Sequence, residues 1–303
     1  MKFEKLTLKD KELFDRYVYP YKFLSCEYAF TTLYIWKDAC DVQYTIYKNA
    51  LIIKKQDFEG NYYFMNPLGY RDEDLKEILT KLIKYKEENN MKYIFKDLDE
   101  KFAMKIQNFA KEYEAKVCIK EDRNNFDYLY EAEKLSKLSG KKLHSKKNFY
   151  NSFVKTYNYE VKQINNETVK KDIIEISKKW YEENNNSNKY LYYEMKAIED
   201  ILNNFELLDL RAIVVYVDNK VVAFSIGQKL NKDLAVIHIE KGDINYKGVY
   251  SFINKTFIDM CFNDVKIINR EQDLGIDGLR KSKLSYQPFK LEKKFIFNCL
   301  QHV

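Results

Sequence analysis

The sequence predicts a two-domain α+β protein in which one order of secondary-structure elements occurs twice. A chain of 303 residues is long enough for two domains of ordinary size. Hydrophobic residues make up 46% of it, while Gly and Pro number only 8 and 3, which is typical of regular helices and strands joined by short loops. Two stretches, starting near residues 42 and 210, each read as three strands, a helix and a further strand.

Hydrophobic periodicity predicts the elements of the first half. A strand over 2–8 and a helix over 10–18 precede an aromatic-rich helical segment at 25–36, whose Tyr28, Leu33 and Trp36 share one face and are expected in a core. The later elements are strands at 42–47, 51–55 and 62–65, a helix over 72–88, a strand at 93–95 and a helix over 99–113.

The second half repeats this order. Its elements are helices over 168–183 and 190–205, strands at 210–217, 221–226 and 234–240, a helix over 249–261 and a strand at 265–268. Equivalent strands are offset by about 170 residues, and a near-constant offset predicts two domains of one architecture. We place these domains at residues 1–130 and 131–303, with the active site in the second.

Three strands, a helix and a parallel strand form the core order of the GNAT acyltransferase fold. The sequence therefore predicts two tandem GNAT-like domains with mixed sheets flanked by helices. In that fold the two strands that flank the helix splay apart, and the acyl donor and acceptor meet in the gap. Here these strands are 234–240 and 265–269. Element order alone is an analogy at the level of the fold.

Composition narrows the functional classes. The chain has 52 basic and 46 acidic residues, a formal charge of +6 that mildly favours anionic partners. Five widely spaced cysteines and three histidines predict neither a metal site nor a disulfide framework. The N-terminus resembles no signal peptide and no run is long enough to span a membrane, so we expect a soluble cytoplasmic protein. Oligomeric state is not predicted.

A polar cluster follows the strand 265–268 directly. Arg, Asp and Asn side chains at the carboxyl end of a strand, followed by a cationic helix, commonly hold an anionic ligand. The predicted substrate-binding residues are Asn269, Arg270, Asp273, Arg280, Lys281, Lys283 and Tyr286. A capped surface helix after a core strand is the alternative interpretation of this segment.

Three residues are candidates for catalysis. His238 and Glu240 lie two apart on one strand and project from one face, and Glu271 follows the partner strand. Acyl transfer from an activated ester needs a base for the proton of the acceptor, and either glutamate is a candidate for that base. The alternatives are that His238 and Glu240 occupy the wet face of a sheet and that Glu271 pairs with an arginine.

Two further groups are candidates for anion binding. Lys141, Lys142, Lys146 and Lys147 lie within eight residues near the predicted domain boundary, where they suit a phosphate-rich partner or, equally, a solvated helix face. Lys247 and Gly248 precede the helix 249–261, and a helix N-terminus can bind phosphate. In coenzyme A-dependent GNAT enzymes the pyrophosphate binds at this turn, although the full glycine-rich signature is absent here.

The segments 126–130, 135–148 and 269–288 carry a specific resemblance. They are similar to small stand-alone members of the phosphatidylglycerol lysyltransferase C-terminal domain family, over essentially the whole chain. The resemblance implies a tandem GNAT fold related to lysyl-phosphatidylglycerol synthases and Fem-type peptidoglycan aminoacyltransferases. Those relatives move an aminoacyl group from tRNA to a lipid or cell-wall amine or hydroxyl. The chain departs from the lipid synthases because it lacks a membrane-spanning segment.

Three functions remain open from sequence. The first is an aminoacyltransferase that uses aminoacyl-tRNA as donor and has a lipid or cell-wall precursor as acceptor. The second is an acyl-CoA-dependent N-acyltransferase of a small amine. The third is a non-catalytic module that binds tRNA or an anionic surface. In the first two, aminoacyl-tRNA or acyl-CoA is a co-substrate and no cofactor is obligatory; peripheral contact with anionic lipid is compatible with the first and third.

Overall fold

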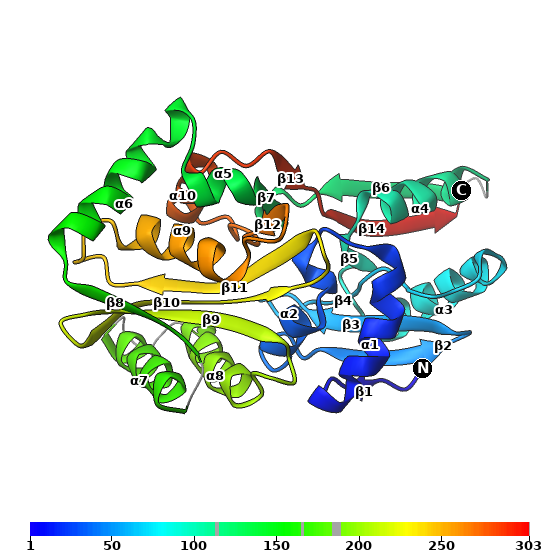
Figure 1. Cartoon of the computed structure of the whole chain (residues 1–303). Coiled ribbons are helices and arrows are strands. Elements are labelled where there is room, and N and C mark those ends of the chain that lie inside the picture. The colour runs from blue at the N-terminus through cyan, green and yellow to red at the C-terminus, as the bar shows by residue number, and fades with distance from the viewer. Residues whose placement is uncertain (113–114, 165–166, 184–188, 303) are drawn as a thin grey trace. The chain divides into compact units, whose positions relative to one another are not determined.

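The computed structural model describes residues 1–112, 115–164, 167–183 and 189–302, and the chain divides into two compact units (Figure 1). Unit 1 contains Met1–Phe126 and Lys293–Val303, and unit 2 contains Asp127–Glu292. Within the described ranges, no helix is both long and apolar enough to cross a membrane.

Unit 1 is a mixed sheet with helices packed on it. Its described strands, in sheet order, are β1 (Glu4–Lys5), β2 (Gln43–Tyr47), β3 (Ala50–Gln56), β4 (Tyr62–Phe64), β5 (Phe95–Leu98), β14 (Phe295–His302) and β6 (Ala115–Glu121). Its helices are α1 (Lys11–Val18), α2 (Phe30–Ile35), α3 (Leu75–Glu88) and α4 (Glu100–Glu112). Amphipathic α3 buries Leu75, Ile78, Leu79 and Leu82, as its period of apolar residues predicts.

Unit 2 is built the same way. Its described strands, in sheet order, are β13 (Lys290–Glu292), β7 (Asp127–Glu131), β12 (Ile267–Asn269), β11 (Leu234–Gly242), β10 (Lys220–Lys229), β9 (Leu210–Val217) and β8 (Tyr159–Gln163). Its helices are α5 (Ala132–Lys137), α6 (His144–Thr156), α7 (Glu167–Glu183), α8 (Lys189–Asn203), α9 (Val249–Cys261) and α10 (Asp277–Ser285). Within this unit α7 and α8 lie on one face of the sheet, and α9 lies on the other (Figure 1).

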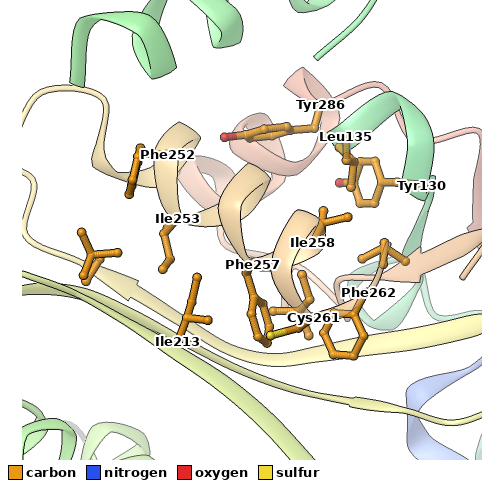
Figure 2. Close-up of a cluster of buried hydrophobic side chains, with 14 of the residues drawn as sticks. Tyr130, Leu135, Ile213, Phe252, Ile253, Phe257, Ile258, Cys261, Phe262 and Tyr286 are labelled. Carbon is orange, nitrogen blue, oxygen red and sulfur yellow. The ribbon is translucent and has the colours of Figure 1, made fainter. Parts of the chain in front are cut away.

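Helix α9 is the centre of the unit 2 core. Its buried residues are mostly apolar, whereas Tyr250 and Met260 are exposed and Lys255 and Asp259 are partly exposed. Phe257 and Ile253 point toward the sheet, where Ile213 lies, and Tyr286 and Tyr130 lie on the other side of the helix (Figure 2). Because α9 has neighbours on both sides, a buried polar residue on it requires a partner within the protein.

The predicted repeat is confirmed, and with it the tandem GNAT-like fold. In both units three antiparallel strands lead into a helix and then into a strand parallel to the third. In unit 1 the parallel pair is β4–β5, through Phe64 and Phe95. In unit 2 it is β11–β12, from the pair Leu234 and Ile267 to the pair Val236 and Asn269.

The observed units differ from the predicted domains 1–130 and 131–303 at both ends of the second. Strand β7 pairs with β12 and β13 and so belongs to unit 2, whereas β14 lies between β5 and β6 and so belongs to unit 1. The physical reason is that an open sheet edge accepts any strand with suitable alternation, so sequence position does not identify the partner. The predicted helix 99–113 is observed as α4, and residue 113 lies outside the described residues.

A buried ion cluster holds the C-terminal segment within unit 1. Glu27 pairs with Lys55 and, at 3.4 Å, with Lys294, and Lys55 also pairs with Asp97 at 3.0 Å. All four side chains are buried. Burial alone would raise the pKa of Glu27, but the charges of Lys55 and Lys294 more than offset it and lower this pKa to about 2. The cluster therefore depends on the charged form of Glu27.

We expect Glu27→Gln to destabilise unit 1 by about 3–5 kcal/mol at pH 7, because two buried lysines lose a counter-charge. A depressed carboxyl pKa contributes stability above its unfolded value of 4.5, and that contribution is lost as the pH falls from 4.5 toward 2. The difference between wild type and variant should therefore shrink below pH 4.5. Urea unfolding can be followed by Trp36 fluorescence in a Trp180→Phe background, since Trp36 lies in unit 1 and Trp180 in unit 2.

Glu121→Gln is the matched control, because the Glu121–Lys293 pair is also in unit 1 but half exposed. Its effect should stay within about 0.5 kcal/mol. An equal effect of the two variants at pH 7 would contradict the role assigned to the buried cluster.

Candidate active site

The candidate site lies where β11 and β12 separate. Their parallel pairing ends at Val236 and Asn269, after which β11 continues to Gly242 paired with β10 but not with β12. The chain turns away from β11 at Glu271, whose φ of 55° lies in the left-handed region. The space between the separating segments is filled by side chains from both, so the gap predicted from the fold is present but occupied by polar groups of the protein.

A β-bulge at His238 aims these side chains. Ile226 pairs with Ile239 and Gly227 pairs with Ile237, so His238 has no residue of its own opposite it on β10. The extra residue shifts the alternation of β11 by one. Before the bulge, Ile237 belongs to the core around α9; after it, Glu240 faces α9, and Lys241 pairs with Glu194 on α8. Without the bulge Glu240 would lie on the opposite face.

Glu240 and Arg270 form an ion pair across the gap. The Nη2 of Arg270 donates to Oε1 of Glu240 at 2.8 Å, and Nδ2 of Asn254 on α9 donates to Oε2 at 3.1 Å. Burial disfavours the charged guanidinium, but the negative charge of Glu240 outweighs this, so the pKa of Arg270 is raised. Both partners are about nine-tenths buried, which makes the pair a fixed part of the site.

Glu271 contacts His238, with Nδ1 of His238 2.9 Å from Oε1 of Glu271. The His238 side chain is fully buried, whereas that of Glu271 is 16% exposed. Asn269 fixes the turn because its Oδ1 accepts from the backbone N–H of Glu271 at 2.7 Å. Lys283 on α10 donates from Nζ to the carbonyl of Arg270, with the carbonyl of Glu271 at 3.4 Å. Of Glu240 and Glu271, Glu271 is thus the carboxylate that is held in place by hydrogen bonds and is also more exposed to solvent.

Asp273 and Arg280, which we predicted to bind substrate, are engaged with each other. The Nε and Nη2 of Arg280 donate to the two oxygens of Asp273, each at 2.9 Å, and Tyr128 donates to Oδ2 at 2.6 Å. Burial would raise the pKa of Asp273, but the hydrogen bonds from Arg280 and Tyr128 lower it to about 2. In the described structure this pair anchors the loop to β7 and α10, a structural role.

The remaining predicted site residues differ in how deeply they are buried. Lys283 and Tyr286 are buried in the site, and Asn269 is buried against Asp127, to which its Nδ2 donates at 2.8 Å. Lys281 is exposed on α10. Of the four lysines at and just before the start of α6, Lys146 is half-buried with Nζ 4.4 Å from the ring centroid of Tyr286, whereas Lys141, Lys142 and Lys147 are exposed. The tertiary fold brings one lysine of the four to the site.

The turn before α9, where we predicted anion binding by Lys247 and Gly248, is covered by α6 and the chain that follows it. The backbone N–H of Lys247 donates to the hydroxyl of Tyr157 at 3.0 Å, and that of Val249 donates to the carbonyl of Tyr246 at 3.1 Å. A Cβ added to Gly248 would lie 2.2 Å from the carbonyl oxygen of Phe149. These contacts engage two N–H groups of the turn and pack α6 against Gly248, and anion binding by Lys247 and Gly248 stays a prediction.

Sequence reasoning missed the polar residues that complete the site. Asn254 and Ser251 lie three apart on α9, and Tyr128 and Tyr130 lie two apart on β7. Ser251 Oγ is 3.4 Å from the hydroxyl of Tyr286, and Tyr130 donates to the carbonyl of Lys283 at 2.7 Å. Ser251 and Asn254 lie at helical spacing on the same buried side of α9 as its apolar residues, and this was the available signal for α9.

A cavity of about 710 Å³ lies on the other face of the unit 2 sheet. It is bounded by α7, α8, the end of β11 and the loop after it, and none of the predicted site residues lines it. Its wall contains five carboxylates, three lysines and the aromatic rings of Trp180, Tyr181, Tyr246 and Tyr250. This excess of carboxylates and aromatic rings favours a ligand with an ammonium group over an anion.

Unit 1 has an acid at the position equivalent to Glu271. Asp97, with φ of 57°, follows the last parallel pair of its unit by two residues, as Glu271 does in unit 2. The Asp97 side chain is buried, pairs with Lys55 and accepts from the hydroxyl of Tyr63 at 2.8 Å. The same backbone geometry thus presents a buried acid, Asp97, in unit 1 and a partly exposed acid, Glu271, in unit 2.

Comparison with known proteins supports a family assignment. The family model described as "Phosphatidylglycerol lysyltransferase, C-terminal" matches residues 20–298. A conserved protein of unknown function from Bacteroides thetaiotaomicron is 30% identical, with a TM-score of 0.88, and the match covers 99% of this chain and 100% of that one. L-PGS from Bacillus licheniformis has a TM-score of 0.63 at 13% identity, over 95% and 92% of the two chains.

A curated relative of similar extent is an uncharacterized protein from Mycoplasmoides gallisepticum. It is 25% identical over 213 residues, which is 70% of this chain and 67% of that protein.

We expect Gly248→Ala to destabilise unit 2 by about 1 kcal/mol or more, because an added Cβ meets the Phe149 carbonyl and φ is 89°. Gly278→Ala is the control: nothing lies within 4 Å of its added Cβ, and within α10 alanine should stabilise by about 0.5–1 kcal/mol. Urea unfolding followed by Trp180 fluorescence in a Trp36→Phe background measures both. Equal stability of the two variants would mean that α6 does not close this turn.

Proposed function

This chain belongs to the phosphatidylglycerol lysyltransferase C-terminal family, and from that premise we propose that it is an aminoacyltransferase. Its donor would be an aminoacyl-tRNA and its acceptor an amine or hydroxyl group of a lipid or cell-wall precursor. Family membership and the GNAT-like fold support transferase chemistry in general. The observation that carries the proposal within unit 2 is the accessible Glu271 carboxylate, held beside buried His238 where β11 and β12 separate.

Glu271 is suited to act as the general base. The acceptor lone pair attacks the ester carbonyl carbon of the donor, forming the new C–N or C–O bond, and the acceptor proton passes to Glu271. The tetrahedral intermediate then collapses: the ester C–O bond breaks, and the ribose oxygen of the tRNA leaves with that proton. His238 lies within hydrogen-bond distance and orients the carboxylate, so Glu271 need not reorganise between the two proton transfers.

The other polar groups would position the reactants. The Glu240–Arg270 pair is tied to α9 through Asn254, so it supplies a fixed cation beside Glu271 in the chain. The cavity on the other face of the sheet is not lined by these residues, so it does not bear on the choice between an amine and a hydroxyl acceptor.

An acyl-CoA donor is the second candidate, and the closure of the α9 turn argues against it. Pyrophosphate binding at a helix N-terminus needs free backbone N–H groups and an open approach. Here Tyr157 takes the N–H of Lys247, and the Phe149 carbonyl packs against Gly248. An acyl-CoA would therefore have to displace α6 before its pyrophosphate could bind at this turn.

We expect Glu271→Gln to reduce transfer by about a hundredfold or more while folding is retained, because the amide preserves shape but cannot accept the proton. The assay would supply total tRNA charged with radiolabelled amino acids, together with amine acceptors and phosphatidylglycerol vesicles. Acid-stable label that has left the tRNA measures transfer. Parallel reactions with acetyl-CoA test the second candidate.

Glu131→Gln is the control, since Glu131 is an exposed glutamate of unit 2 paired only with Lys134 in the described residues. Normal turnover by Glu271→Gln would make Glu271 structural and move the base to Glu240 or to water. Absence of transfer by the wild type with either donor would contradict the proposed activity and favour a non-catalytic binding module.

A further inference from the structure

The cavity beside α7 and α8 in unit 2 is long as well as large, with a volume of about 710 Å³. Helix α7 contributes to its wall from Asp172 to Glu183, a length of about 16 Å at 1.5 Å per residue. Helix α8 contributes from Leu191 to Ile198, and the end of β11 with the loop after it contributes a further part of the wall. These dimensions fit an extended, chain-like ligand.

Three carboxylates of this wall have no cationic partner in the described part of the chain. The salt bridges within the wall are Lys241–Glu194, at 2.5 Å, and Lys179–Glu183, at 3.7 Å. Among the described residues, no lysine or arginine lies within ion-pair distance of Asp172, Glu175 or Asp243. The remaining lysine of the described wall, Lys220, is exposed. The described wall therefore carries two more negative than positive charges, and a cationic ligand would reduce their repulsion.

The unpaired carboxylates occupy two separate positions over the sheet. Asp172 accepts from the hydroxyl of Tyr216 on β9 at 2.5 Å, whereas Asp243 follows β11 and its Oδ1 accepts from the backbone N–H of Asn245 at 2.9 Å. Strand β10 lies between β9 and β11, so these two strands are about 10 Å apart. The apolar side chains that line the same wall are Ile176, Leu191, Met195 and Ile198. A ligand that meets both positions needs cationic groups separated by an apolar segment.

Aromatic rings complete the wall. Trp180 lies nearly parallel to the ring of Phe224, with the ring centroids 6.0 Å apart, and Tyr181, Tyr246 and Tyr250 also line the cavity. Burial of its hydroxyl and nearby carboxylates, among them Glu194 and Asp243, raise the pKa of Tyr250. The carboxylates thus act on the electrostatics of the wall, and electron-rich ring faces add an attraction for ammonium groups.

We propose that this cavity binds a linear aliphatic polyamine, a chain in which ammonium groups alternate with methylene segments. The ammonium groups would meet Asp172 and Glu175 at one position and Asp243 at the other, with the methylene segments against the apolar residues between α7 and α8. A single lysine side chain from a protein partner would satisfy only one of these positions. The length of the cavity and its two anionic positions therefore favour a polyamine over an isolated amine.

The experiment titrates spermidine into the full chain by isothermal titration calorimetry at about 0.15 M NaCl, where non-specific surface attraction is screened. We expect Glu175→Gln to weaken binding about threefold, because one partly exposed charge pair is lost. The double variant Glu175→Gln, Asp243→Asn should weaken it about tenfold, since the two carboxylates act at separate positions. Asparagine at 243 keeps the oxygen that accepts from the N–H of Asn245, so the turn is retained.

Glu182→Gln is the matched control, because Glu182 is exposed on the same helix but does not line the cavity. Unfolding followed by Trp180 fluorescence in a Trp36→Phe background checks that each variant folds. The proposal is overturned if spermidine does not bind, or if Glu175→Gln and Glu182→Gln bind it equally. It is also overturned if the neutral chain 1,8-octanediol binds as tightly as spermidine, or if a lysine-containing peptide binds and spermidine does not.

This site is independent of the proposed aminoacyltransferase activity, because none of the candidate catalytic residues His238, Glu240 and Glu271 lines the cavity. Glu271→Gln should accordingly leave the affinity for spermidine unchanged. Spermidine binding by a protein that transfers no label would refute only the activity. Transfer by a protein that does not bind spermidine would refute only the polyamine site.

Discussion

The ion pair between Glu240 and Arg270 is the interaction on which the geometry of the site depends. It joins β11 to the segment after β12 at the point where the strands no longer share backbone hydrogen bonds. An aligned, buried pair needs both partners, because either charge alone would be left in a low-dielectric environment. Asn254 secures the glutamate from α9, and the rings of Tyr130 and Tyr286 flank the arginine. Polar side-chain contacts thus bridge the two segments where the strands have separated.

The same backbone geometry presents an acid in each unit, and the surrounding side chains determine how exposed that acid is. In each unit a residue in the left-handed region follows the last parallel pair by two positions, Asp97 in one and Glu271 in the other. In unit 1 a lysine and a tyrosine enclose the acid, and the resulting cluster contributes to stability. In unit 2 the longer glutamate meets a histidine and remains partly exposed. One structural motif therefore supports a core in one unit and a candidate catalytic group in the other.

Helix α6 packs against two parts of unit 2, the turn before α9 and the ring of Tyr286. It closes the turn before α9 with the Phe149 carbonyl, and the Tyr157 hydroxyl that follows it takes a further N–H of that turn. The same helix places Lys146 against Tyr286, beside Arg270. The turn before α9 is thus occupied by contacts within the protein, and Lys146 places positive charge at another position on the same helix.

The sequence by itself determined the repeated fold and most of the residues at the site. Periodicity located the strands and helices of both repeats, and the change from apolar to polar residues after Ile268 identified Arg270 and Glu271, because burial and alternation leave a local record. The tertiary structure decided what depends on partners distant in sequence. It assigned β7 and β14 to their sheets, paired Asp273 with Arg280, and covered the turn at Gly248. It also placed Asn254 against Glu240 and Lys146 against Tyr286, while the neighbouring lysines are exposed. A bulge, a strand edge and a packed helix depend on long-range contacts that no local sequence pattern encodes.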